Sequence, residues 1–332
     1  MIADDPLPSA SVAPTGSDAV SVVVVSFNSE RYLERSLGWA ANRGYEVVLV
    51  DSASTDGSVA LVRQTFPNVR VIELDRNIGY GAANNVGIES ATRPFVLVVN
   101  PDAWPIGDAV GHLLRAAEER PRAGIVGPRL VDEGGERQLS IRGFPTLWRL
   151  ATEFFFLRWF APWSRALNAF YGAGVDPTRR AEVDWLMGAA ILVRRDALDA
   201  VGVFDGAFFM YSEEVDLAYR MRRDGWTTLY EPAATFVHVG GASTRLRPSA
   251  YYRELIRSHV RFFAKHHGRL AAQRARRLLF ASMRLRALIF RGERGRIAVE
   301  TAAWLRRHDV VSLLAPREPF DGADHPEADT PT

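Results

Sequence analysis

The sequence predicts an α/β fold with a mostly parallel central sheet flanked by helices, followed by a helical extension at the C-terminal end. Short runs rich in β-branched residues alternate with helical patterns between residues 20 and 99, which is typical of βαβ units. Polar residues directly follow three of these runs. The carboxyl ends of parallel strands meet at one edge of a sheet, where ligands bind, so the same pattern predicts a site at that edge.

The first half of the chain is the more regular one. Buried strands are expected over 20–26, 46–50, 69–74 and 95–99. One helix is expected from a cap at Ser29 to about Asn42, a second begins after 55–57, and a third covers 82–91 behind the glycine-containing loop 77–81. The strand 95–99 is pivotal, because Pro101 cannot continue a central strand and leaves Asp102 just beyond its carboxyl end.

The second half is less regular. Strands are expected over 125–127, 138–142, 227–230 and 235–239, and a loop leads into a further strand within 183–194. Helices are expected behind Asp196 and over 213–223, the latter capped by Ser212. The segment 146–171 is dense in aromatic residues and arginine. It forms either a helical piece of the core or an exposed apolar surface for a lipid-bearing partner.

Charge is distributed unevenly along the chain. The whole sequence carries a formal charge of +2, but the part from Arg253 to Arg307 holds 14 Arg and one Lys against three Glu, which gives +12. A basic segment suits an anionic partner such as membrane lipid, polyphosphate or nucleic acid. On a helical wheel, 269–291 separates a basic half from an apolar half, so it either lies in a bilayer interface or packs on the rest of the protein with its arginines in water.

The polar residues at the predicted sheet edge are candidates for binding a ligand. Asp102 is well placed to hold a cation, since Mg²⁺ and Mn²⁺ prefer oxygen ligands, and its convergence with Asp51 and Asn28 predicts a nucleotide site. Turn chemistry alone is the alternative, since Asn, Pro and Asp all favour turns. No Gly-x-Gly-x-x-Gly follows the first strand and no Walker lysine is present, which disfavours a Rossmann dehydrogenase and a P-loop enzyme. The chain has no cysteine, which excludes disulfides and thiolate metal sites.

Two further features are candidates for chemistry. Glu213, Glu214 and Asp216 crowd the first turn of a predicted helix, where acids complement the helix dipole and where crowding also raises a carboxyl pKa enough to make a usable base. His238 ends a predicted strand beside a glycine pair. It serves either as a structural residue or as a ligand for metal or phosphate.

Taken in order, the motifs resemble those of family 2 glycosyltransferases with the GT-A fold, and most of all their rhamnosyltransferase branch. The resemblance covers about residues 20–265 and rests on these blocks: Val-Ser-Phe-Asn, Val-Asp51-Ser-Ala-Ser-Thr-Asp-Gly-Ser58, Arg76-Asn-Ile-Gly-Tyr-Gly-Ala-Ala-Asn-Asn85, Asn100-Pro-Asp102, Trp185-Leu-Met-Gly188, Glu213-Glu-Val-Asp-Leu217 and His238-Val-Gly-Gly-Ala-Ser243.

The resemblance implies a role for each of these positions. Asp51 would accept a hydrogen bond from a pyrimidine ring, and Phe27 would lie beside that ring. Asp102 matches the last acid of the metal-binding Asp-x-Asp, whose first position is Asn100 here, so that metal binding would either be weaker or depend more on His238. Glu214 stands where the family usually has an Asp as general base, with Glu213 and Asp216 as alternatives. The remaining implied positions are Asn77, Gly79 and Asn84 for the nucleotide sugar and Trp185 and Gly188 for the acceptor.

The implied activity is an inverting transfer of L-rhamnose from dTDP-L-rhamnose to a lipid-linked glycan in cell-wall or surface polysaccharide synthesis, with Mg²⁺ or Mn²⁺ as cofactor. UDP-galactofuranose, UDP-GlcNAc and UDP-glucose are alternative donors, and a non-catalytic sugar- or lipid-binding module is the alternative of another class. No nucleic-acid partner is expected, because such a partner would not explain Asp51, Asp102 and Glu214.

The expected organisation follows from these assignments. A catalytic domain covers 20–250, with a nucleotide-binding half over 20–127 and an acceptor-binding half over 128–250, and a basic helical extension covers 251–312. Disordered tails are expected over 1–19 and 313–332, the first without signal-peptide features. No apolar run reaches the roughly 18 residues that span a bilayer. We therefore expect a cytoplasmic protein bound peripherally to the inner face of the membrane.

Overall fold

The structure is a computed structural model, and it describes residues 17–315 except 162, 173 and 241–247. The two tails predicted over 1–19 and 313–332 thus lie almost wholly outside the described residues. Residues 241–243, which end the last motif block, also lie outside them.

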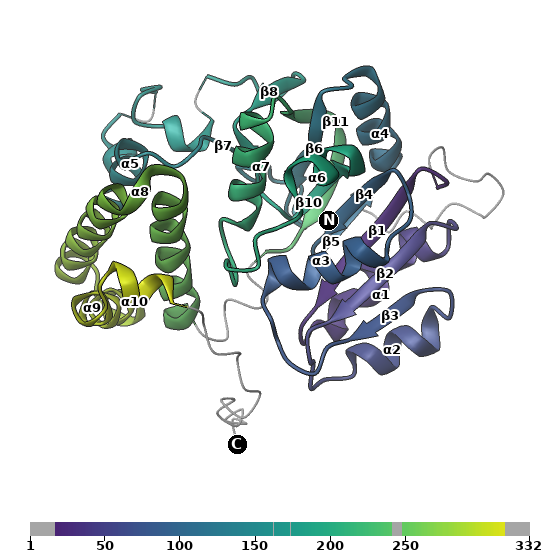
Figure 1. The fold of residues 1–332 in the computed structure, drawn as a ribbon, viewed down its shortest axis with the longest axis horizontal. Helices are drawn as coiled ribbons and strands as arrows, with labels where there is room; N and C mark the ends of the chain where they lie inside the picture. Colours follow the sequence, from purple (N-terminus) through teal and green to yellow (C-terminus); the bar gives the residue numbers. More distant parts are fainter. Residues whose placement is uncertain (1–16, 162, 173, 241–247, 316–332) are drawn as a thin grey trace.

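The first half forms the expected parallel sheet (Figure 1). Its strands are β1 (Val20–Ser26), β2 (Glu46–Asp51), β3 (Arg70–Glu73) and β4 (Phe95–Val99), arranged in the order β3-β2-β1-β4. All neighbours in this group are parallel, and every residue of β1 and β4 is buried. The connecting helices are α1 (Glu30–Ala41), α2 (Ser58–Thr65) and α3 (Tyr80–Ser90). Continuous apolar runs form these strands because both faces of the sheet are covered by helices.

The second half completes a mixed sheet. Strand β10 (Ala190–Arg194) lies antiparallel between β4 and β6 (Ala123–Val131), and β6 pairs in parallel with β11 (Thr227–His238). The two strands expected over 227–230 and 235–239 are thus one strand, whose register shifts between Glu231 and Thr235. The sequence analysis missed β5 (Ala103–Ile106), which tolerates a proline because it is an edge strand.

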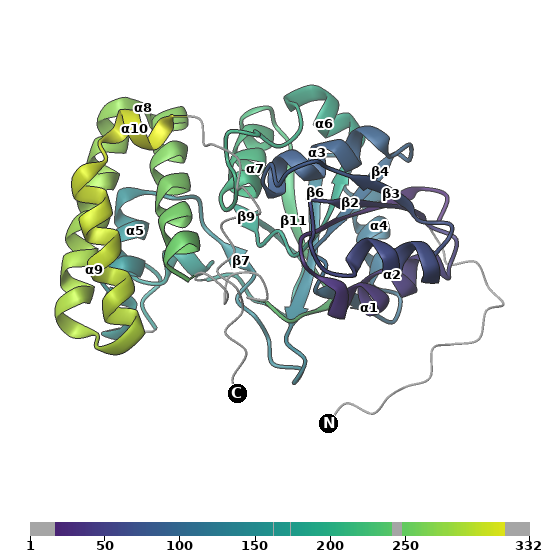
Figure 2. The ribbon, with the colours of Figure 1, turned by 90° about the horizontal axis from the view of Figure 1, so that it is seen from below.

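Smaller elements complete the part of the chain before α8. They are β7 (Ile141–Arg142), which pairs antiparallel with β9 (Trp185–Leu186), β8 (Ala181–Val183) on β11, and the helices α4 (Ala109–Glu119), α5 (Leu147–Phe154), α6 (Arg195–Val201) and α7 (Glu213–Arg223). Helices α1, α2 and α4 pack on one face of the sheet and α3, α6 and α7 on the other (Figures 1 and 2). Each face has its own apolar core, so the sheet is buried on both sides.

The C-terminal extension is a helical bundle. Helix α8 (Pro248–Ile289) bends at Gly268, whose φ of 82° is not helical, and α9 (Gly292–Arg307) and α10 (Val310–Leu314) pack back on it. Helix α5 joins the same bundle (Figure 2). On the apolar side of α8, Leu279 and Met283 are fully buried. Packing inside the bundle therefore accounts for these residues of the apolar half of 269–291. The arginines at 269, 274, 277 and 284 are exposed.

Among the described residues, no helix is both long enough and apolar enough to cross a bilayer.

Candidate active site

The loops that follow β1 and β2 are joined by hydrogen bonds around Asp51. Both oxygens of the Asp51 carboxylate accept from Ser54, one from its backbone N–H (2.8 Å) and one from its hydroxyl (2.6 Å). The Ser54 hydroxyl accepts in turn from the N–H of Asn28 (2.9 Å). Burial raises the pKa of Asp51, and the Ser54 hydrogen bonds oppose that rise. Phe27 follows β1 beside this group and is partly exposed.

Strand pairing brings Asp102 and His238 together, as expected at this edge. His238 ends β11 opposite Ala103, the first residue of β5, and so lies next to Asp102. The distance between Asp102 Oδ1 and His238 Nε2 is 3.6 Å. Asn100 Nδ2 also faces Nε2, at 3.3 Å. Burial lowers the pKa of His238, and the Asp102 carboxylate opposes that shift.

Gln138, which the sequence analysis did not single out, holds the His238 ring. Its Nε2 donates to the backbone carbonyl of His238 (2.6 Å), so its Oε1 faces the ring Nδ1 (2.9 Å). Because Oε1 can only accept, Nδ1 carries the proton and Nε2 presents a lone pair toward Asp102. A ligating histidine is usually fixed in this way by a second hydrogen bond.

These residues fit a divalent cation. Two donor atoms 3.6 Å apart can both reach one ion at ligand distances of about 2.1 Å. The Asn100 side-chain oxygen is occupied by the Tyr80 hydroxyl (2.7 Å). Within the described residues no group of three or more His, Asp or Glu side chains could hold a metal. The pair Asp102 and His238 therefore offers only part of a coordination sphere, which oxygens of a diphosphate would complete.

Tyr80 lies between the pair Asp102 and His238 and the acids of α7. Its hydroxyl donates to Asn100 Oδ1 and lies 3.3 Å from the carbonyl oxygen of Gly188. Burial raises the pKa of Tyr80, and the charges of Glu213, Glu214 and Asp102 raise it further. The phenol therefore stays neutral and lies within electrostatic reach of both acidic groups.

Glycine at position 79 makes this placement possible. Gly79 has a φ of 93°, and a Cβ there would lie 2.4 Å from the backbone oxygen of Phe209. The same oxygen accepts from the backbone N–H of Tyr80 (2.7 Å). Asn77 supports the turn, because its side-chain oxygen accepts from Gly79 N–H (3.0 Å).

Glu213 and Glu214 lie at the N-terminus of α7 with unusual protonation behaviour. Burial raises the pKa of Glu214 to about 7, while backbone N–H groups of Glu214, Val215 and Gly188 oppose the rise. Burial also raises the pKa of Glu213, and the neighbouring Glu214 charge adds to it. The Oε2 atoms of both are buried and find no hydrogen-bond partner among the described residues. Glu214 is the more exposed of the two, which suits a base that must reach a substrate.

Asp216 points the other way, toward α8. It accepts from Arg220 (2.8 Å), Lys265 (2.7 Å) and His266 (2.7 Å) and is fully buried. Burial alone would raise the pKa of Asp216, but these partners outweigh it and lower the pKa to about 2. A carboxylate held so firmly in its charged form joins α7 to α8.

The other predicted positions lie around or beneath the site. Asn84 is fully buried, and its Nδ2 donates to the Tyr80 carbonyl (2.9 Å). Trp185 is also buried, and its indole N–H donates to the Gly143 carbonyl (2.9 Å). Gly188 lies against Glu214, since a Cβ there would lie 3.6 Å from the Glu214 side chain. The structure therefore brings Gly188 next to the acids and places Asn84 and Trp185 as supporting residues.

Backbone strain is concentrated at this site. Asn28, Ala53, Tyr211 and Ser212 have φ values of 50°, 61°, 66° and 66°, although none is glycine. Each such residue costs about 1–3 kcal/mol and persists only where the surroundings impose it. Ser212 precedes α7 but makes no side-chain cap hydrogen bond there, contrary to the expected capping role. The strained pair Tyr211 and Ser212 directs the first turn of α7 into the site.

Comparison with known proteins identifies the family of this chain. The family model described as Glycosyl transferase family 2 matches residues 21–216, more than half of the chain. An N-acetylglucosaminyl-diphospho-decaprenol L-rhamnosyltransferase from Mycobacterium tuberculosis is 36% identical over 266 residues, which cover 76% of this chain and 86% of the relative. Rhamnosyltransferase WbbL from Escherichia coli is 23% identical over 266 residues, covering 74% of this chain and 93% of the relative.

A solved structure supports the fold. GalNAc-T7, determined with UDP, GalNAc and Mn²⁺, is similar to this chain with a TM-score of 0.53 at 15% identity, covering 89% of this chain and 57% of that one. That similarity confirms the expected GT-A fold. The family match and the 36% identity confirm the resemblance inferred from the motifs. The chain belongs to glycosyl transferase family 2 and is a rhamnosyltransferase-like member of it.

Proposed function

We propose that this protein is an inverting rhamnosyltransferase that uses dTDP-L-rhamnose as donor and a polyprenyl-diphosphate-linked glycan as acceptor. The observation that carries the chemistry is the position of Glu214, whose carboxyl group has a pKa of about 7 and lies within electrostatic reach of Tyr80. Tyr80 in turn donates to Asn100, which faces the pair Asp102 and His238. The substrates are suggested by the name of the mycobacterial relative. Membrane association would follow from the lipid-linked acceptor.

In this proposal each group has one task. Asp51 and Phe27 bind the base of the nucleotide, with Asn77, Gly79, Asn84 and Asn100 shaping the loop and floor beneath the diphosphate. Asp102 and His238 would hold Mg²⁺ or Mn²⁺, which when bound neutralises charge that builds on the diphosphate leaving group. Gly188 and the strand β9 that carries Trp185 border the acceptor.

The reaction itself is a single displacement. The Glu214 carboxylate takes the proton from an acceptor hydroxyl as that oxygen attacks the anomeric carbon. The bond from that carbon to the diphosphate oxygen breaks, and dTDP leaves with the bonding electrons. Attack from the face opposite the leaving group inverts the anomeric configuration, and the protein forms no covalent bond to the sugar.

The test is a donor panel with a lipid-linked N-acetylglucosaminyl acceptor. Purified protein would be assayed with dTDP-L-rhamnose, UDP-galactofuranose, UDP-GlcNAc and UDP-glucose in the presence of Mg²⁺ or Mn²⁺. We expect turnover with dTDP-L-rhamnose, and NMR of the product should show the anomeric configuration opposite to that of the donor. Turnover with a UDP-sugar instead would reassign the donor, and a retained configuration would reject the single displacement.

A further inference from the structure

The aromatic segment after α5 exposes three large side chains to solvent. Trp159, Phe160 and Trp163 are 72%, 79% and 82% exposed. Phe154 and Phe170 of the same segment are 3% and 9% exposed and belong to the core. Some aromatic residues of the segment 146–171 thus belong to the core, and others form an exposed apolar surface. Exposed clusters of large apolar side chains mark interaction surfaces.

The turn between α8 and α9 lies beside this segment. The Phe156 and Phe290 rings are 5.5 Å apart, and the Arg286 guanidinium lies 4.3 Å from the Phe156 ring centre. Leu288 and Ile289, the last two residues of α8, are 82% and 55% exposed. We call Trp159, Phe160, Trp163, Leu288 and Ile289 the apolar tip. Because α9 runs from this turn toward α10, the tip is at the end of the bundle opposite α10 (Figure 2).

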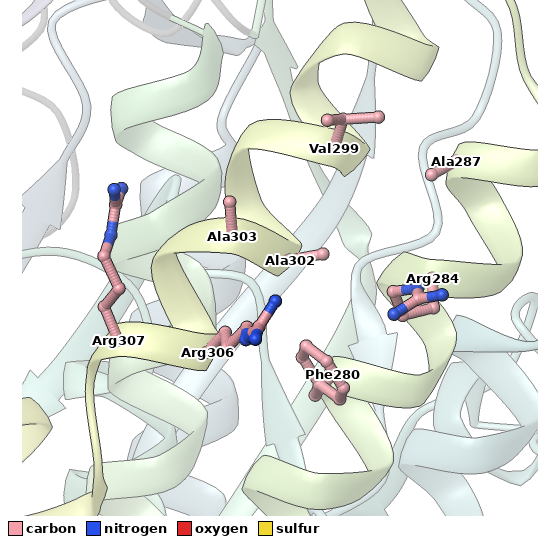
Figure 3. Close-up of a pocket in the computed structure, with 8 residues that line it drawn as sticks. All are labelled: Phe280, Arg284, Ala287, Val299, Ala302, Ala303, Arg306 and Arg307. Carbon is pink, nitrogen blue, oxygen red and sulfur yellow. The ribbon is translucent and has the colours of Figure 1, made fainter.

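A groove with arginines on both walls runs along the bundle, with Arg284 at the end near the tip and Arg306 and Arg307 at the end near α10. It lies between α8 and α9, measures about 440 Å³ and has an apolar lining that includes Phe280 and Val299 (Figure 3). Arg284 projects from α8 and Arg306 and Arg307 from α9, and none of the eight described lining residues is acidic. Leu288 follows Arg284 by one helical turn, so the groove and the tip share one side of α8.

Exposed apolar side chains and exposed arginines on one side of the bundle suit an anionic lipid surface. Aromatic and aliphatic side chains insert at the level of the headgroups, and nearby arginines bind lipid phosphates. A second copy of this chain fits less well, because an interface between copies would bring arginines of equal charge together. We propose that the apolar tip and the groove arginines dock this protein on an anionic bilayer.

The end of the bundle that carries the tip also contains the start of α8, where Arg286 lies within electrostatic reach of Tyr252. Farther along α8, Ser258 donates to the carbonyl of Met210 (2.8 Å), three residues before Glu213. An acceptor whose lipid stays in the bilayer would thus approach Glu214 from the membrane side. This reading of the acceptor rests on the proposed function, whereas binding to the bilayer does not.

The experiment is cosedimentation of the full chain with vesicles of phosphatidylcholine alone or of equal parts phosphatidylcholine and phosphatidylglycerol, at low and high salt. We expect binding to the anionic vesicles that weakens with salt. Trp159→Ser/Phe160→Ser should weaken it at least tenfold, and Arg284→Gln/Arg306→Gln about tenfold or more at low salt. The control Arg120→Gln/Arg179→Gln removes the same charge from exposed positions of the catalytic domain and should bind like the unaltered protein.

Three outcomes would overturn the docking proposal. Absence of vesicle binding, or binding that neither double variant changes, would reject the docking surface. Sedimentation velocity is the second measurement: a dimer that Trp159→Ser/Phe160→Ser converts to monomer would assign the tip to a second copy. Because the residues of both pairs are exposed, the double variants should remain folded, and circular dichroism checks that they do. If vesicles are bound as expected but no nucleotide sugar is turned over, the proposed function fails and the docking surface stands.

Discussion

Gln138 and His238 exchange two hydrogen bonds although 100 residues separate them in the chain. The amide nitrogen of Gln138 donates to the His238 carbonyl, and the imidazole Nδ1 donates to the amide oxygen. This exchange leaves Nε2 unprotonated and directed at Asp102, which is the state that a cation ligand requires.

The first prediction concerns that exchange. Gln138→Leu should lower the affinity for Mn²⁺ by about 10- to 100-fold, because the imidazole is no longer held in one tautomer and one orientation. Calorimetric titration of Mn²⁺ in the presence of dTDP measures the effect. Gln138→Glu retains an acceptor for Nδ1 and should recover part of the affinity. Unchanged Mn²⁺ affinity in the Leu variant would separate His238 from cation binding.

The second prediction concerns the general base. Glu214→Gln keeps the shape of the side chain but removes its basicity, so kcat should fall by about 10²- to 10⁴-fold with donor affinity nearly unchanged. The neighbouring Glu213→Gln is the matched control and should retain more activity. If Glu213→Gln is instead the inactive variant, the base is Glu213.

The third prediction concerns pH, for which activity and stability change in opposite directions. With a pKa of about 7, the Glu214 carboxylate forms only as the pH approaches neutrality, so kcat/KM should rise up to about pH 7. The unfolded chain has the ordinary carboxyl pKa of 4.5, so the folded state binds more protons between the two values. Stability should therefore fall as pH rises from about 4.5 to about 7.

Glu214→Gln also tests this prediction. Urea unfolding of the variant should show a smaller loss of stability across that interval than the unaltered protein shows. An equal pH dependence in both proteins would mean that Glu214 does not titrate there.

The fourth prediction concerns the join between α7 and α8. Asp216→Asn leaves Arg220, Lys265 and His266 without their carboxylate and should lower the free energy of unfolding by about 3 kcal/mol. Because the Asp216 pKa is lowered to about 2 from 3.8, its stabilisation is present above 3.8 and is lost as pH falls toward 2. Urea unfolding at pH 7 measures the effect. Asp196→Asn, on an exposed position of α6, should change stability by less than about 0.5 kcal/mol.

The sequence by itself determined the fold class, the family and the parallel half of the sheet. The predicted strands 20–26 and 95–99 coincide with β1 and β4. A strand covered on both faces must be apolar at every position, and such a run is legible without knowledge of its neighbours. Asp102 and His238 could likewise be placed at one sheet edge, because strand ends of a βαβ fold converge there.

Only the tertiary structure decided which side chains meet. Tyr80 lies in a motif block and Gln138 in none, and neither position shows that Tyr80 meets Asn100 beyond β4 or that Gln138 meets His238 at the end of β11. Asp216 belongs to the same acidic run as Glu214, yet it faces α8, because successive residues of a helix point to different sides. Hydropathy likewise could not separate Phe154 from Trp159, since both are large and apolar, and burial depends on whether a neighbouring helix covers the side chain.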